Sequence, residues 1–517
     1  MPTPNPVRPR VRVSRRRGRR SSRSWSRTVR FSRAGGMPRS LPGNGPMGQG
    51  QSCFTGSVTP ETVPLRTLLA LLGDPPAVGR SDWLSARIAA LVGEGRLTPG
   101  ARLPSERMLA AELGFSRGTV VRALDAAGER GVLRARQGSG RTVRGPSAPG
   151  PVESLTARSA PLAPGAVDLR ATVLPPHPEL GSAAAEAAAR LAEDPAWGSA
   201  PADGIPELIE QICGHYARRG LPTEPRQIVV TNGAVSGLHL AVRSMTARGA
   251  RVGTENPGYP NSARVITAAH RRAMPIDLAA DHAGSIVQAV SSGALAAAVL
   301  TPDFHNPTGR LLGAEDRVRL LRAAARTGTP LIIDETLAGI NWHRTPAPPP
   351  TAGEGATTLL VGSLSKSLWA GLRIGWVRTS EDIADALSHL RLGVDLGMPP
   401  LEQRIAARLM PTMTADGVPH CHEHITSSWE LVAETLAELL SHWTWTAPEG
   451  GLSLWVTGTR LPAPELVFRA GERGVALHPG ALFSPLGTGW PHALRLPFSG
   501  RAAPLRRALE VLAELEG

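Results

Sequence analysis

The size and composition of the chain fit a soluble globular protein. Its 517 residues are 41% hydrophobic and 19% charged, a balance that supports a large core and roughly two to four domains. No apolar run approaches the length of a membrane-spanning helix, so we expect no transmembrane segment. Cys53, Cys213 and Cys421 are scattered, which argues against a disulfide scaffold or a zinc module and fits a reducing cytoplasm.

The net charge of +14 is concentrated near the N-terminus. Residues 1–60 contain 13 arginines and no acidic residue, and residues 76–150 contain 12 arginines against 6 acidic residues. The 367 residues after position 150 sum to −4. A basic block on one part of a chain indicates a polyanionic partner there.

Residues 1–60 are rich in Arg, Ser, Pro and Gly, and with so little to bury they are predicted to form a disordered basic arm. Such an arm can bind nucleic acid, and an Arg- and Ser-rich, acid-poor composition is also typical of a transit peptide. A third interpretation, which we favour, is that translation starts at Met37 or Met47, so that the arm is never made.

The segment 65–144 has the pattern of a winged helix-turn-helix. Apolar spacing and capping residues predict helices over residues 65–73, 82–94, 104–113 and 116–130. Residues 131–144 alternate as a hairpin around a glycine-rich tip. Two short helices joined by a tight turn and followed by a hairpin indicate a DNA-binding module. Residues 145–166, rich in Pro, Ala, Gly and Ser, are predicted to be a linker.

In such a module the second helix of the pair enters the major groove of double-stranded DNA. Its first turn carries Ser116, Arg117 and Thr119, with Arg122 nearby, and Arg107 in the preceding helix is within reach of a phosphate or a guanine edge. The wing is surrounded by further cations that could follow the DNA backbone, namely Arg134, Arg136 and Arg141.

Three stretches, residues 103–107, 116–122 and 136–140, resemble the DNA-binding domain of the GntR family. They read Leu103-Pro104-Ser105-Glu106-Arg107, Ser116-Arg117-Gly118-Thr119-Val120-Val121-Arg122 and Arg136-Gln137-Gly138-Ser139-Gly140. The resemblance implies DNA contacts by Arg107, Ser116, Arg117 and Gly138, and a phosphate contact by Thr119. Many members carry a second recognition-helix arginine at the place of Val121, and here that arginine is Arg122, one position later.

From residue 167 onward, strands and helices alternate. Strand-like apolar runs occur at residues 227–231, 296–301, 331–334 and 358–362, separated by helical stretches rich in Ala, Leu and Arg. This alternation predicts parallel strands with crossover helices, and so an α/β domain over residues 167–517.

Lys366 is the only lysine in the chain, against 56 arginines. A guanidinium stays protonated and cannot form an imine, whereas an amine whose pKa falls on burial can. The flanking residues 363–376 are mostly small, apolar or glycine, unlike those around a solvated surface lysine. The sequence therefore predicts that Lys366 forms an imine with an aldehyde cofactor.

Other residues meet the further needs of such a cofactor, which are a carboxylate at the ring nitrogen, a donor to the phenolic oxygen, a flat group over the ring and a phosphate cup. Asp334 ends an apolar strand, where ligand sites of α/β proteins lie. Asn306 lies in a tight turn, and Tyr259 is one of only two tyrosines, the other being Tyr216. Residues 231–235 have the order strand, glycine turn, helix start, which can cradle a phosphate.

The ordered occurrence of these motifs resembles the fold type I pyridoxal 5′-phosphate enzymes of the aspartate aminotransferase class. The resemblance implies that Lys366 is the Schiff-base lysine and Asp334 the partner of the pyridine nitrogen. It implies that Asn306 bonds the phenolic oxygen and that Tyr259 stacks on the ring. It also implies a carboxylate clamp at Arg495 and phosphate contacts by Gly233, Ala234, Val235, Ser363, Ser365 and Arg373.

Two positions depart from the pattern of that class. The usual tyrosine that donates to the phenolic oxygen is absent, and Leu337 stands three residues after Asp334. Trp197-Gly198-Ser199 occupies the place of a tyrosine that often reaches the partner subunit's cofactor phosphate. Cofactor binding is still expected, whereas efficient transamination is less so.

A winged helix-turn-helix followed by an aminotransferase-like α/β domain resembles the MocR subgroup of the GntR regulators. The resemblance implies a cytoplasmic, homodimeric transcriptional regulator that binds DNA and pyridoxal phosphate and senses the cofactor or a small amino effector. The alternative is a catalytically active aminotransferase with a fused DNA-binding domain, because fold alone does not fix function.

Overall fold

The structure, a computed structural model, describes most of the chain beyond residue 61. The described residues are 62–93, 97, 101–129, 132–136, 140–143, 165–193, 202–278, 281–343, 348–414 and 418–517. The predicted arm, the predicted linker up to residue 164, the segment 197–199 and Gly138 lie outside them. The domain boundaries therefore stay predictions. Among the described residues there is no helix with the length and apolar character needed to span a membrane.

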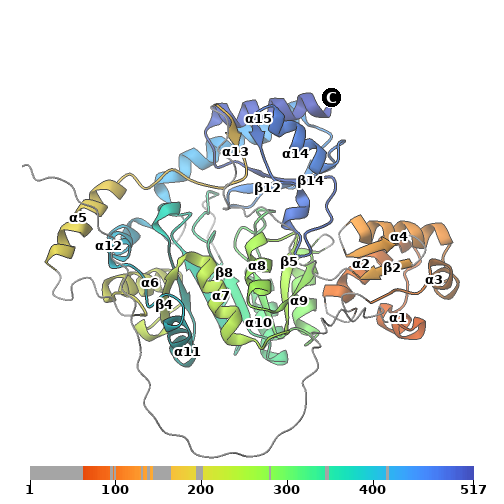
Figure 1. Ribbon diagram of the computed structural model, residues 1–517, viewed down its shortest axis with the longest axis horizontal. Helices are drawn as coiled ribbons and strands as arrows, with labels where there is room; N and C mark the ends of the chain where they lie inside the picture. The colour runs from red at the N-terminus through yellow and green to blue at the C-terminus, as the bar shows by residue number, and fades with distance from the viewer. Residues whose placement is uncertain are drawn as a thin grey trace, which may run out of the picture. The chain divides into compact units, whose positions relative to one another are not determined.

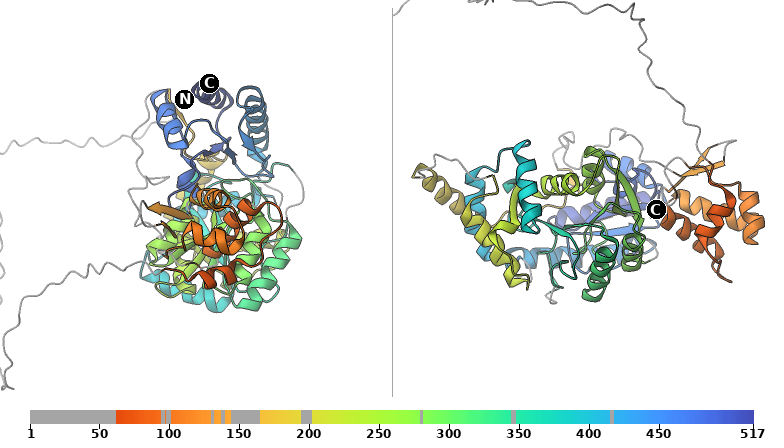
Figure 2. Two further views of the ribbon diagram at one scale, coloured as in Figure 1. Left: turned by 90° about the vertical axis from the view of Figure 1, so that its right-hand side faces the viewer. Right: turned by 90° about the horizontal axis from the view of Figure 1, so that it is seen from below.

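Four helices and a hairpin follow each other in the first described part, as predicted. They are α1 (Leu65–Leu72), α2 (Arg80–Gly93), α3 (Glu106–Leu113), α4 (Arg117–Glu129), β1 (Leu133–Arg136) and β2 (Gly140–Val143). They form one group in Figure 2 and share a core of buried apolar side chains. Ser105 caps α3 by accepting a hydrogen bond from the Met108 amide at 3.3 Å. Gly114, at φ +64°, makes the left-handed turn between α3 and α4.

The larger part of the chain is built on a seven-stranded sheet with the order β4-β10-β9-β8-β7-β5-β6. Its strands are β4 (Ile228–Asn232), β5 (Arg251–Asn256), β6 (Arg272–Asp277), β7 (Ala297–Leu300), β8 (Leu331–Asp334), β9 (Thr358–Ser363) and β10 (Ile374–Arg378). The four predicted strands correspond to β4, β7, β8 and β9, each within one residue at either end.

The four predicted strands run parallel to one another, whereas β10, which was not predicted, runs antiparallel to both β4 and β9. Ten residues connect β9 to β10, and a parallel return needs a crossover of about a dozen residues or more. The short connection therefore forces the chain to turn back directly, and this turn contains Lys366.

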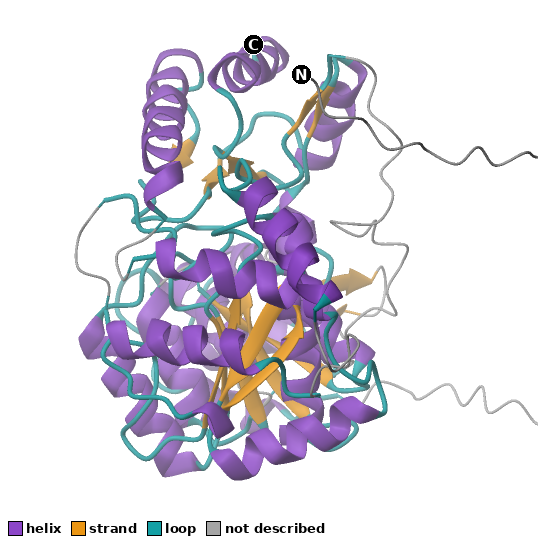
Figure 3. Ribbon diagram, turned by 90° about the vertical axis from the view of Figure 1, so that its left-hand side faces the viewer, coloured by secondary structure: helices purple, strands orange, loops and turns teal. Residues whose placement is uncertain are grey.

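Helices cover both faces of this sheet, as Figure 3 shows. Successive strand residues alternate between two cores, so that Leu331 and Ile333 belong to one and Ile332 to the other. The covering helices are α5 (Leu180–Ala192), α6 (Pro206–Arg218), α9 (His282–Ser291), α10 (Ala314–Thr327) and α12 (Pro400–Leu409) on the first core, and α7 (Gly233–Met245), α8 (Pro260–Ala268) and α11 (Glu381–Leu392) on the second.

A second, smaller layer was not resolved in the sequence pattern. The antiparallel sheet β11 (Thr444–Trp445), β12 (Ser453–Thr457) and β14 (Ala493–Pro497) packs beneath α13 (His422–Leu439), α14 (Ala463–Glu472) and α15 (Ala502–Glu516) (Figure 1). The strand β3 (Val167–Asp168) pairs with β13 (Val475–Ala476) and is thereby fixed to this layer. The residues that follow β3 enter the site described next.

Candidate functional site

The loops after β4, β5, β7, β8 and β9 all leave the large sheet at its carboxyl edge, where ligand sites of α/β proteins lie. There they enclose a cavity of about 600 Å³. Ten of the eleven cofactor and carboxylate residues named from the sequence line it: Ala234, Val235, Tyr259, Asn306, Asp334, Ser363, Ser365, Lys366, Arg373 and Arg495. Gly233 lies directly beside it, at the start of α7.

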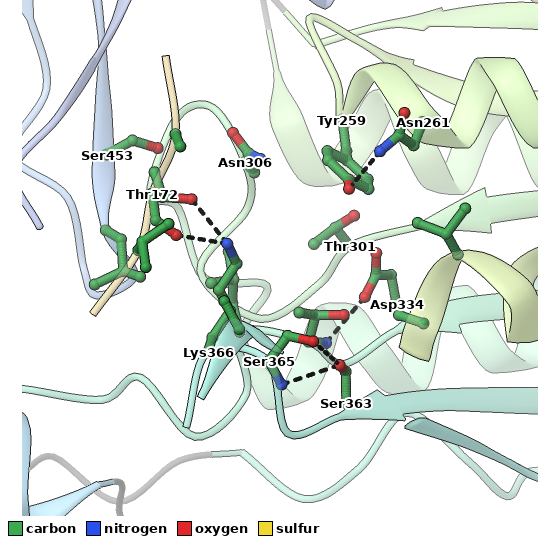
Figure 4. A pocket seen from close by; sticks show the side chains of 18 of the residues that line it. Thr172, Tyr259, Asn261, Thr301, Asn306, Asp334, Ser363, Ser365, Lys366 and Ser453 are labelled. Carbon is green, nitrogen blue, oxygen red and sulfur yellow. Dashed lines mark hydrogen bonds between the residues drawn. The ribbon is translucent and has the colours of Figure 1, made fainter. Parts of the chain in front are cut away.

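Lys366 lies in the turn between β9 and β10, and its amine points into the cavity toward Thr172 (Figure 4). Its Nζ donates to the Thr172 carbonyl oxygen at 2.5 Å and to the Thr172 hydroxyl at 3.2 Å. Burial lowers the pKa of Lys366 to about 8, and the nearby positive charges of Arg495 and Arg373 act in the same direction. An amine with this pKa is partly unprotonated near neutral pH, and an unprotonated amine is a nucleophile.

Asp334, Asn306 and Tyr259 lie around the same space (Figure 4). Burial raises the pKa of Asp334, although its carboxylate accepts a hydrogen bond from the Thr336 amide at 2.9 Å. The Oδ1 atom of Asn306 is buried and has no partner among the described residues. The Tyr259 hydroxyl accepts a hydrogen bond from Asn261 at 2.6 Å. A buried carboxylate and an unpartnered buried amide oxygen suit a ring that carries polar atoms.

The predicted phosphate site combines a helix N-terminus with a cation. The backbone N–H groups in the first turn of α7 have no carbonyl acceptor within the helix, so they can donate to a ligand. Gly233 has φ +65°, and a Cβ atom there would lie 2.8 Å from the guanidinium of Arg373. Across the site, the Ser363 hydroxyl accepts a hydrogen bond from the Ser365 amide at 3.2 Å. These groups are all suited to an anion.

Replacing Gly233 with alanine is expected to weaken binding of a phosphate-bearing ligand about tenfold or more. The added Cβ would push the Arg373 guanidinium off the helix N-terminus, and a charge-assisted hydrogen bond contributes about 1.5 kcal/mol or more. Ligand titration followed by absorbance measures the change. Gly249→Ala is the matched control, because Gly249 has φ +77° and nothing within 4 Å of its added Cβ. Equal affinities of the two variants would contradict this role of Gly233.

Arg495 is almost fully buried in β14, and its guanidinium donates to the main-chain oxygen of Arg170. Burial lowers its pKa to about 10. No carboxylate lies within ion-pair distance of Arg495 among the described residues, and its Nε has no partner there. A buried guanidinium without a carboxylate is a ready partner for an anionic ligand.

The structure also brings in residues that the sequence did not single out. Thr172 holds the lysine amine mainly through its backbone oxygen, which any residue type could supply, so no sequence signal marks it. The neighbour of Asp334, Glu335, is held by Tyr216 at 2.7 Å and by Arg219 at 3.1 Å, which fixes the end of β8. The cavity wall at Leu337 is apolar, as expected from the missing tyrosine.

The predicted DNA-contact residues lie on the exposed side of α3 and α4. Arg107, Ser116, Arg117 and Arg122 are exposed, and Thr119 is half-buried. The Ser116 hydroxyl caps α4 by accepting from the Thr119 amide at 3.1 Å, and the two hydroxyls lie 2.8 Å apart. Arg117 thus extends from the first turn of a capped helix, as a recognition helix requires.

Arg141 was expected to follow the DNA backbone, but its side chain contacts the module itself. Its guanidinium lies 2.6 Å from Asp125 and 3.3 Å from Glu106, so it ties β2 to α4 and α3. A guanidinium engaged by two carboxylates is poorly placed to neutralise a phosphate. Arg134 remains exposed.

The fold and the site together define a class of protein, a helix-turn-helix module joined to an aminotransferase-type domain. Residues 81–143 match the family "Bacterial regulatory proteins, gntR family", and residues 175–512 match "Aminotransferase class I and II". The chain is 35% identical to the HTH-type pyridoxine biosynthesis transcriptional regulator PdxR of Corynebacterium glutamicum, over 61% of this chain and 69% of that protein. It is 28% identical to the HTH-type transcriptional regulator TauR of Rhodobacter capsulatus, over 79% of this chain and 91% of that one.

The chain therefore belongs to the MocR-type HTH transcriptional regulators, which combine a GntR-family DNA-binding domain with an aminotransferase class I and II domain. The fold of the larger part is also that of solved aminotransferases. LysN, an α-aminoadipate aminotransferase from Thermus thermophilus, superposes with a TM-score of 0.61 at 23% identity, over 68% of this chain and 92% of that one.

Proposed function

We propose that this regulator binds pyridoxal 5′-phosphate at Lys366, and that the cofactor or an amino compound bound beside it alters how the protein binds DNA. A ligand has this effect when it binds one arrangement of the protein better than another. The relatives support the regulatory role, since two of them are named as transcriptional regulators and one of these as a regulator of pyridoxine biosynthesis.

The charge inventory of the cavity carries this proposal. Four cationic residues line it, namely Arg170, Lys366, Arg373 and Arg495, and Asp334 is the one carboxylate among its lining residues. Arg170 is paired with Asp168, and among the described residues no carboxylate lies within ion-pair distance of the other three cations. A cavity with this excess of positive charge favours anionic ligands. A phosphate group beside Arg373 and a carboxylate beside Arg495 would balance the charge.

The residues fit the cofactor group by group. Lys366 supplies the amine, Asp334 a buried carboxylate for the ring nitrogen, and Asn306 a side-chain NH2 group that can donate to the phenolic oxygen. Gly233 leaves room for Arg373 beside the first turn of α7. When bound, pyridoxal phosphate supplies an aldehyde that condenses with amines and a ring that draws electrons from them. The solved LysN structure, which contains N-(5′-phosphopyridoxyl)-L-leucine, has such a ligand in the same fold.

Transamination is the second candidate function, because Lys366, Asp334 and Arg495 all lie in one cavity. The apolar wall at Leu337 counts against it, since a hydroxyl donor to the phenolic oxygen is missing there. As parts of the first proposal, the regulator acts as a homodimer and works in the cytoplasm, where it has access to DNA.

The first experiment measures binding of the full-length protein to the DNA that flanks its own gene, with and without pyridoxal phosphate. Ionic strength is held fixed, because phosphate contacts make the affinity depend on salt. Pyridoxamine phosphate, which has the phosphate but no aldehyde, is the matched control ligand. A DNA affinity that changes with pyridoxal phosphate but not with pyridoxamine phosphate supports the proposal. No specific DNA binding, together with turnover of an amino acid to its keto acid, would contradict it and favour the enzyme.

A further inference from the structure

A short segment that begins at the last residue of β3 forms one wall of the cavity next to Arg495. It comprises Asp168, Leu169, Arg170, Ala171 and Thr172, and the last three of these line the cavity. The segment is attached to the small sheet by the Leu169 amide, which donates to the Ala476 oxygen at 2.7 Å. It contacts Arg495 through the main-chain oxygen of Arg170. Arg170, Ala171 and Thr172 therefore lie beside the position of a ligand held by Arg495.

Asp168 holds Arg170 in a closed, bidentate pair. Its two carboxylate oxygens accept from the Nε and the terminal nitrogen of Arg170, both at 2.9 Å, and Oδ1 also accepts from the Arg170 amide at 2.9 Å. Burial alone would raise the pKa of Asp168, but the hydrogen bonds and charge of Arg170 hold it below its ordinary value. Asp168 is therefore ionised at neutral pH, and it neutralises Arg170.

The arginines of the cavity can then bind only two anionic groups, one phosphate and one ligand carboxylate. Arg373 lies at the phosphate end and Arg495 faces the ligand end, whereas Arg170 already has its own carboxylate. When Lys366 is occupied by the cofactor aldehyde, no further arginine or lysine among the lining residues is left for a second ligand carboxylate. A carboxylate brought into the cavity without a cation would lose its hydration and gain nothing in return.

Much of the remaining wall is apolar. Leu337 and Leu452 are buried side chains that line the cavity, and Val173, 47% exposed, continues the wall beyond Thr172. Apolar side chains favour an apolar ligand group because its contact with them removes both from water. Leu337, in place of a tyrosine, adds to this apolar wall.

We propose that the cavity selects an amino compound with one carboxylate and an uncharged, apolar side chain, and that Asp168 enforces this choice by neutralising Arg170. The inference rests on the proposed function, because it concerns the ligand of the same cavity. Asp168 itself does not line the cavity, so it is a positioning residue that acts through Arg170. Removing its charge leaves Arg170 as a second cation for a dicarboxylic ligand.

The test compares two ligands that lack an amine, 4-methylpentanoate and glutarate, by the shift in thermal unfolding temperature of the full-length protein. The protein is first loaded with pyridoxal phosphate, so that Lys366 and Arg373 are both occupied. The cofactor absorbance of the same samples shows whether loading failed, which separates a failure of the proposed function from a failure of this inference. We expect 4-methylpentanoate to bind about tenfold more tightly than glutarate. Leucine and glutamate, followed by the absorbance of the cofactor-loaded protein, are expected to show the same order.

Asp168→Asn is expected to improve glutarate binding relative to 4-methylpentanoate by about tenfold. Asp316→Asn is the matched control, because it breaks a similar aspartate–arginine pair, with Arg319 at 2.8 Å, on helix α10. Equal binding of the two carboxylates by the unmodified protein would overturn the proposal, and this arm needs no variant to fold. An unchanged ratio in a folded Asp168→Asn protein would overturn the role of Asp168.

Discussion

Replacing Lys366 with alanine is expected to abolish the absorbance band of covalently attached pyridoxal phosphate. Lys366 is the only lysine, so no neighbouring side chain can supply a second ε-amine. The fold is expected to survive, because the amine lies between two other cations, Arg495 and Arg373, whose charges disfavour its protonated form. Titration of the purified variant with pyridoxal phosphate, followed by absorbance, measures the loss.

Lys366→Arg is the matched control for charge. It keeps a cation at this position but cannot condense with an aldehyde, so it is expected to lose the same band. Circular dichroism and the thermal unfolding temperature show whether each variant is folded. A cofactor spectrum that is unchanged in the folded alanine variant would mean that Lys366 is not the attachment site.

Replacing Arg117 with alanine is expected to weaken specific DNA binding by about 1 to 3 kcal/mol, which is roughly 5- to 150-fold in affinity. Arg117 is exposed at the first turn of α4, and the Ser116 cap that precedes it stays intact in the variant. The loss is therefore that of a contact and not of the helix. Fluorescence anisotropy with specific and scrambled DNA at one ionic strength measures it.

Arg190→Ala is a suitable control for this experiment. Arg190 is an exposed arginine of α5 that pairs with Glu186 at 2.9 Å, so its removal changes the net charge equally without touching the helix-turn-helix. Cofactor titration of the Arg117 variant should match that of the unmodified protein. If both arginine variants bound specific DNA with equal affinity, α4 would not be the recognition helix.

The sequence predicted most of the site because its chemistry depends on particular residue types in a fixed order. An amine, a carboxylate and an amide at the ends of apolar strands are recognisable without a structure, and Lys366, Asp334 and Asn306 do line one cavity. The helix-turn-helix was predictable for a similar reason, since capping residues such as Ser105 and Ser116 mark where helices begin.

The parts that were missed depend on geometry that residue types do not encode. The direction of β10 follows from the length of the connection before it, and not from its apolar pattern. The contact of Thr172 with Lys366 is made mainly by a backbone oxygen. Arg141 pairs with Asp125 and Glu106, and these three residues come from three different elements. The sequence alone therefore could not show whether a basic residue near the wing contacts DNA or pairs within the module.

The single lysine of the cavity also makes the protein unusually simple to label. Aldehydes and acylating reagents attack primary amines, and apart from the α-amino group this chain offers only the Lys366 amine. Every other basic side chain that would carry background labelling in most proteins is here a guanidinium or an imidazole. Borohydride trapping of the aldehyde should therefore mark one tryptic peptide, and the mass of the intact chain would report directly the fraction of molecules that hold the cofactor.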